Sequence, residues 1–145
     1  MLNKRLIALA GATLVTASLF VGCGAKAEEG FTGVKTGEVA GEKDTTIAEV
    51  TFENGTPVDV EIDVKNADGT MKSEASESGA YDMKNDGAAW HEQVDSLEDA
   101  IVDNKFDLSK ITLINEEGNT DAVSGVSIKV GGFIEAVQKA LDQAK

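Results

Sequence analysis

Residues 121–132 (DAVSGVSIKVGG) combine two hydroxyl side chains with an acid, a lysine and three glycines. A serine hydroxyl can carry a covalent group, and glycine lets the backbone approach a ligand closely. The last two glycines precede an apolar pattern typical of a helix, and the first N–H groups of a helix attract anions. Lys129 adds a positive charge. The stretch therefore suits an anionic group, such as a phosphate, held near Ser124 or Ser127.

Two other interpretations of these residues remain open. An ordinary strand-turn-helix junction would also use serines, because their hydroxyls bond to the nearby backbone in turns. A hydrolase built on Ser127, His91 and Asp121 has the necessary residue types, but the sequence lacks the G-x-S-x-G pattern of a nucleophile elbow. It also lacks a P-loop, a G-x-G-x-x-G pattern and the D-x-D-x-D-G pattern of calcium sites.

The chain begins like a secretory signal peptide. Lys4 and Arg5 supply a positive region, and the apolar run that follows ends in small residues just before Cys23. The segment LFVGC resembles a bacterial lipobox, with Phe20 where a leucine is usual. In a lipobox the cysteine receives a diacylglyceryl thioether and becomes the new N-terminus. About two or three acyl chains would anchor the protein stably in a membrane. The alternative is an uncleaved apolar anchor that happens to end in cysteine.

The sequence predicts three parts, a signal peptide at 1–22, a lipidated tether at 23–30 and one domain at 31–145. Without its signal peptide the chain keeps 11 of its 13 basic residues against 26 acidic ones, a net charge of −15. Such a domain is repelled by nucleic acid and by anionic headgroups, so we expect no nucleic-acid partner. The single cysteine leaves none for a disulfide, and the single histidine argues against a Cys/His zinc site.

Alternation of apolar and polar residues predicts an antiparallel hairpin. Residues 45–53 place Ala48, Val50 and Phe52 on one face, and Asn54-Gly55 is a strong turn signal. Residues 58–64 then alternate after Pro57, which suits the start of a strand. The inward residues of this second strand are expected to be Val58, Val60, Ile62 and Val64, and the outward ones Asp59, Glu61 and Asp63. A weaker strand is expected at 31–39, and another beginning at Thr70.

Two helices are expected in the rest of the chain. Apolar residues at helical spacing predict the first, with Asn85 or Asp86 as its cap: Trp90, Val94, Leu97 and Ile101. The pattern over 133–141 predicts the second. The polar stretch 73–80 is expected to be a loop, residues 111–114 (ITLI) a buried strand and residues 116–120 a turn. This order favours an α+β domain with two helices packed on an antiparallel sheet.

The segment Asp121-Ala122-Val123-Ser124-Gly125-Val126-Ser127 resembles the flavinylation motif of FMN-binding domains. That motif has an acid, two variable residues, serine or threonine, glycine, alanine, and then threonine or serine. In that family a transferase takes FMN from FAD and joins it by a phosphoester bond to the final hydroxyl. The resemblance makes Ser127 the acceptor and includes Asp121, Ser124 and Gly125 in the site. Val126 replaces the usual alanine, Ser127 the commoner threonine, and Lys129 a hydroxyl residue found in many members.

The resemblance extends over nearly all of residues 31–145. The hairpin, a Y-x-M-K element (81–84), a W-x-E-Q helix (90–93) and a C-terminal helix occur in this order in small lipoproteins of Gram-positive bacteria. Tyr81, Met83 and Trp90 are therefore candidates for a wall beside the flavin ring. Simple core packing is the alternative for Trp90 and gap filling the alternative for Met83.

The resemblance implies a flavoprotein held on the extracellular face of the cell membrane through Cys23. It would carry electrons from a membrane quinone or flavoprotein donor to an extracellular acceptor, as an electron carrier and not a turnover enzyme. A flavin-free binding or structural lipoprotein with the same fold is the alternative. Some related lipoproteins also release part of their signal peptide as a peptide signal.

Overall fold

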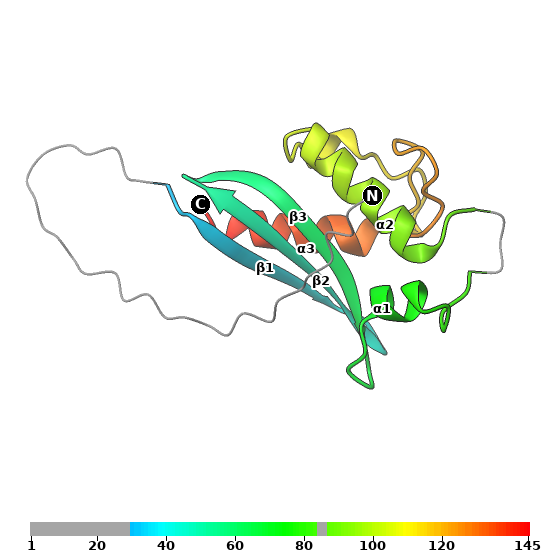
Figure 1. The fold of residues 1–145 in the computed structure, drawn as a ribbon. Coiled ribbons are helices and arrows are strands. Elements are labelled where there is room, and N and C mark those ends of the chain that lie inside the picture. The colour runs from blue at the N-terminus through cyan, green and yellow to red at the C-terminus, as the bar shows by residue number, and fades with distance from the viewer. Residues whose placement is uncertain (1–29, 84–86) are drawn as a thin grey trace, which may run out of the picture.

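The computed structural model describes residues 30–83 and 87–145 (Figure 1). The predicted signal peptide, Cys23, Asn85 and Asp86 lie outside the described residues. Three strands, β1 (Gly33–Ala40), β2 (Asp44–Glu53) and β3 (Thr56–Asn66), form an antiparallel sheet in the order β1-β2-β3. The helices are α1 (Lys72–Glu77), α2 (Trp90–Asp103) and α3 (Gly131–Asp142), with a 3-10 turn η1 at Leu108–Lys110. The fold is α+β, as predicted, but its described part has three α-helices where two were expected.

The core lies between the sheet and the helices. α3 runs behind β1 and β2, whereas α2 lies beside β3 (Figure 1). The inward residues of β2 are fully or almost fully buried, as predicted: Ala48, Val50 and Phe52. The predicted apolar face of α2 is buried as well: Trp90, Val94, Leu97 and Ile101. α2 begins at Trp90 with Ala89 as its N-cap. The carboxylate of Glu92 accepts the N–H of Ala89 at 2.8 Å.

A β-bulge changes the predicted faces of β3. Thr51 pairs with Asp59 but Phe52 pairs with Pro57, which leaves Val58 as the extra residue of β3. Val58 is consequently 37% exposed and does not point into the core, in contrast to the prediction. The predicted inward positions beyond the bulge, Val60, Ile62 and Val64, are buried.

The turn after β3 leads into α1 and not into another strand. The hydroxyl and N–H of Thr70 donate to the Asp68 carboxylate at 2.6 and 3.0 Å, and these bonds lower the pKa of Asp68. Met71 then makes a single bridge to Lys65. The strand predicted from Thr70 is thus reduced to one bridge, because the chain turns into a helix at Lys72.

Buried polar contacts hold α1 in place, where the sequence predicted a loop. Asp63, expected to face solvent, is 6% exposed and accepts the N–H of Ser73 at 3.0 Å and also the Ser73 hydroxyl. One turn later Ser76 bonds to Nδ1 of His91 on α2 at 2.9 Å. Because both partners lie far away in the sequence, the composition of 73–80 gives no sign of this helix.

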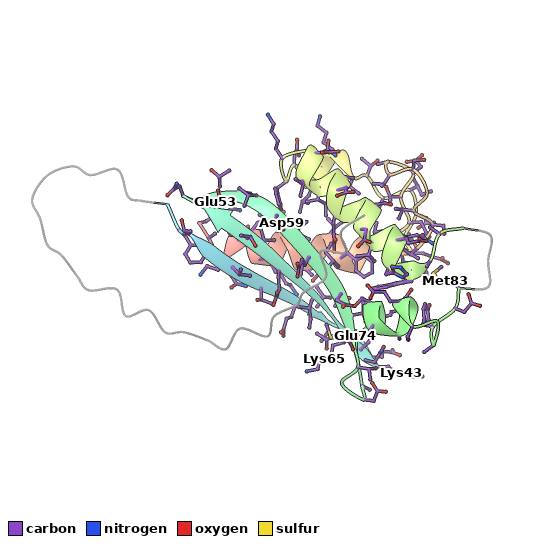
Figure 2. All side chains as sticks on the ribbon, in the orientation of Figure 1. Lys43, Glu53, Asp59, Lys65, Glu74 and Met83 are labelled. Carbon is purple, nitrogen blue, oxygen red and sulfur yellow. The ribbon has the colours of Figure 1, made fainter. Side chains whose placement is uncertain are left out.

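Replacing Asp63 with alanine should lower the free energy of unfolding by about 2–3 kcal/mol, because buried donors of Ser73 lose their acceptor. Urea unfolding measures the loss, and amide exchange should become faster in α1. Asp59→Ala is the matched control, since Asp59 is an exposed acid of the same strand (Figure 2). Its effect should stay within about 0.5 kcal/mol. Equal losses in the two variants would contradict the role of Asp63.

Residues 111–114 do not form the predicted buried strand. Ile111 is buried, but Leu113 is 46% and Ile114 58% exposed, and the segment makes an isolated bridge between Leu113 and Thr120 in place of a strand. The next residues form a turn, as predicted. Gly118 has a φ of +88°, and the Asn115 side chain accepts the N–H of Asn119 at 3.0 Å. Only Ile111 of this apolar run belongs to the core, in contrast to the prediction.

Among residues 30–83 and 87–145, no helix has the length and apolar character needed to cross a membrane.

Candidate functional site

The flavinylation-like segment forms a surface turn whose valines point into the core. Val126 N–H donates to the Val123 carbonyl at 3.4 Å, with Ser124 and Gly125 at the centre of the turn. Gly125 has a φ of +80°, and a Cβ added to it would meet no atom within 4 Å. The buried residues of the segment alternate with exposed ones: Val123, Val126, Ile128 and Val130. The exposed ones are Asp121, Ala122, Ser124, Gly125, Ser127 and Lys129. The two serines thus lie on the surface, and the buried valines and isoleucine of the segment anchor it to the core.

The side chain of Gln93 fixes Ser127 to α2. Gln93 is only 1% exposed, and its Oε1 accepts the N–H groups of Ser127 and Ile128 at 2.7 and 3.2 Å. The Ser127 hydroxyl donates to the same oxygen at 3.3 Å, and the Gln93 amide donates to the Ala88 carbonyl at 2.9 Å. The W-x-E-Q helix and the motif, 34 residues apart, therefore meet at one glutamine.

Gln93 was not among the predicted site residues. A signal existed, because Gln93 sits next to Val94 on the face of α2 that also contains Trp90 and Leu97. A polar side chain on such a face needs buried partners. The sequence does not show which backbone groups become these partners, because folding brings Ser127 and Ile128 to Gln93 from a distant part of the chain.

Gln93→Leu should destabilise the protein by about 2–3 kcal/mol, since two buried N–H groups lose their acceptor. Thermal or urea unfolding measures this. Gln138→Leu is the control, because Gln138 is exposed on α3 and bonds only to the exposed Asp142. A loss no larger than that of the control would show that the bonds of Gln93 do not hold the segment.

The start of α3 differs from the expected open anion site. Gly131 and Gly132 belong to the helix itself. The carbonyl of Gly118 accepts the N–H groups of Val130 and Gly131 at 2.7 and 3.2 Å, so the first donor of the helix is already bonded. Lys129 Nζ lies 3.6 Å from the carboxylate of Glu117, and both side chains are about two-thirds exposed. Of the features expected to attract an anion, the first donor of the helix is thus already bonded, whereas Lys129 stays accessible.

The three predicted wall residues have different environments. Trp90 is 2% exposed and packs edge-to-face on Phe133 at 6.1 Å, so it is a core residue, as the alternative interpretation predicted. Tyr81 is 39% exposed, but Lys72 Nζ lies 4.6 Å from its ring centre. Met83 is partly buried against the core near the start of α2 (Figure 2). Trp90 is therefore not available as a wall, and one face of the Tyr81 ring is already covered by Lys72.

The hydrolase arrangement is not assembled. His91 bonds to the buried Ser76 of α1, whereas the Ser127 hydroxyl is directed to Gln93. In the described part of the chain, no group of three or more histidine, cysteine or acidic side chains is placed to hold a metal ion.

Comparison with known proteins gives one informative match. No protein-family model matches the chain, and no curated protein matches it either. The fold is similar to the solution NMR structure of a structural-genomics target from Clostridium thermocellum, with a TM-score of 0.58 and 30% sequence identity. The match covers 79% of this chain and 92% of the other. At this identity over almost the whole of its relative, the chain belongs to the same family as that Clostridium thermocellum protein.

Proposed function

We propose that the protein is a membrane-anchored extracellular flavoprotein that carries electrons through FMN joined to Ser127 by a phosphoester bond. The observation that carries the proposal is the position of the Ser127 hydroxyl. Ser127 is an exposed residue on a segment whose backbone is held by the buried Gln93, two residues after an open glycine turn. Its hydroxyl makes one long bond of 3.3 Å to Gln93, and a hydroxyl positioned by a fixed backbone on the surface is what a transferase needs in an acceptor.

The residues around Ser127 fit an attached phosphate. The surface beside Gly125 is open, since a Cβ added there would meet no atom within 4 Å. Lys129, two residues on, would neutralise part of the phosphate charge. Its ion pair with Glu117 is exposed, and such pairs contribute about 1 kcal/mol or less, so the ammonium group can reorient at little cost. Asp121 is exposed at the start of the segment. Its carboxylate would orient the acceptor hydroxyl or help to hold a metal ion of the transferase.

The departure at Val126 does not crowd the acceptor. Val126 is 7% exposed and belongs to the core cluster, whereas Ser127 next to it is exposed. The extra bulk relative to alanine is therefore taken up by the core. FMN would supply reversible electron transfer, and the chain would bind it, orient it and limit the access of water.

The remaining parts of the proposal concern location and partners. Acylation of Cys23 would fix the domain to the outer face of the cell membrane. A flavin transferase would transfer FMN from FAD to the Ser127 oxygen, breaking the pyrophosphate bond of FAD, with AMP as the leaving group and the hydroxyl proton released to solvent. A reduced membrane quinone (a quinol) or a reduced flavoprotein would then donate electrons to the attached FMN. A covalent bond suits this location, because FMN lost outside the cell could not be recovered.

The proposal is tested on the mature chain co-expressed with a flavin transferase and compared with the chain expressed alone. We expect an intact mass increased by one FMN and an absorbance band near about 450 nm, both dependent on the transferase. A colourless product with the mass of the polypeptide alone would leave the second candidate, a flavin-free binding or structural lipoprotein. Serine in place of the commoner threonine is the observation that favours it.

A further inference from the structure

An exposed apolar pair lies on the loop next to the Ser127 segment. Leu113 is 46% and Ile114 58% exposed, and Ile114 is the most exposed large hydrophobic residue of the described chain. The pair opens the tight turn 113–120, which the bridge from Leu113 to Thr120 and two bonds between Asn115 and Asn119 hold in shape. The two side chains are consecutive, and contiguous exposed apolar surface can mark a place where a ligand or partner binds.

Asn119 connects this pair to the proposed acceptor. Its carbonyl accepts the N–H of Ile114 at 2.8 Å, and its side-chain amide donates to the Ser127 carbonyl at 3.0 Å. Leu113 also reaches the helix that follows Ser127, since its Cδ1 lies 3.6 Å from the Cβ position of Gly131. Ile114 and Ser127 are thus both direct hydrogen-bond neighbours of one residue. In Figure 1 the orange loop that contains Ser127 lies beside α2.

We infer that Leu113 and Ile114 form the apolar wall against which the isoalloxazine ring of the Ser127-linked FMN packs. The inference rests on the proposed function and gives the ring a place in it. A flavin ring is flat and largely apolar, and binding sites for such groups are lined mainly by apolar side chains. Among the aromatic candidates, Trp90 is in the core and Lys72 lies over one face of Tyr81, which is less exposed than Leu113 or Ile114. The tether at Ser127 brings the ring to the pair, whose exposure leaves it accessible.

The test measures how open the flavin is to solvent. Leu113→Ser/Ile114→Ser, Val34→Ser and the parent chain are each loaded with FMN by the transferase, and flavin fluorescence is quenched with iodide. Val34 is the matched control, because it is an aliphatic residue 52% exposed on β1. All three proteins have the same net charge, so electrostatic repulsion of iodide is equal among them. Removal of the wall uncovers a second face of the ring, and the quenching constant should rise about twofold in the double variant alone.

Each outcome decides either the proposed function or this inference. A parent chain without added FMN mass defeats the proposed function. If FMN is attached but the quenching constant of the double variant equals that of Val34→Ser, the flavin ring does not pack on Leu113 and Ile114. The proposed function is then unaffected. A rise in Tyr81→Ser, without one in the double variant, would instead assign the ring to Tyr81. If the double variant takes up no FMN, Leu113→Ser and Ile114→Ser are measured singly, and quenching at the parent level in both overturns the inference.

Discussion

Ser127→Ala should abolish covalent FMN, because no other atom of residue 127 can form the phosphoester. Intact mass should show the polypeptide without FMN, and the flavin band should be absent after denaturing gel filtration. The fold should survive the change, since the Ser127 N–H still donates to Gln93. The lost hydroxyl bond of 3.3 Å is worth about 1 kcal/mol or less.

Two control variants separate the acceptor from its surroundings. Ser127→Thr keeps a hydroxyl at the same position and should keep the flavin mass. Ser96→Ala removes a different hydroxyl, which donates to the Glu92 carbonyl within α2, and should also keep it. FMN that persists on Ser127→Ala would place the ester on another residue and overturn the proposed acceptor.

Gly37→Ala should destabilise the protein by about 3 kcal/mol or more, the upper end of what overpacking costs. α3 lies directly on β1 at this glycine. A Cβ there would overlap the carbonyl oxygen of Ala136 and lie 2.7 Å from the amide nitrogen of Ala140. Both are backbone atoms, so no change of rotamer relieves the clash. The midpoint of thermal unfolding should fall by about 12 °C or more.

Unfolding of this variant can be followed through Trp90, the single tryptophan, because its ring packs on Phe133 of α3. The control is Gly87→Ala. Gly87 is exposed, and an added Cβ would meet no atom within 4 Å. Its effect should stay within about 0.5 kcal/mol. If Gly37→Ala were as stable as this control, α3 could not pack so closely on the sheet.

Local periodicity was sufficient to predict most of the regular elements. Alternation in 45–64 and the Asn54-Gly55 turn specify the hairpin of β2 and β3, because one face of each strand must be buried. Helical spacing from Trp90 and from Phe133 specifies α2 and α3 for the same reason. The motif around Ser127 was also visible in the sequence, since its hydroxyls, acid and glycine are consecutive. These features depend on neighbours within a few residues.

Contacts between distant residues decided the rest. α1 exists because Asp63 and His91 provide buried partners for two serines, and the bulge at Val58 follows from pairing with β2. The same holds for the site. Gln93 meets Ser127 across 34 residues, and the Gly118 carbonyl accepts the first N–H group of α3. Leu113 and Ile114 remain exposed, although apolar side chains favour burial. The sequence alone therefore determined which residues favour burial or need hydrogen-bond partners. Only the tertiary structure determined which partners they find, because folding brings those partners together from distant parts of the chain.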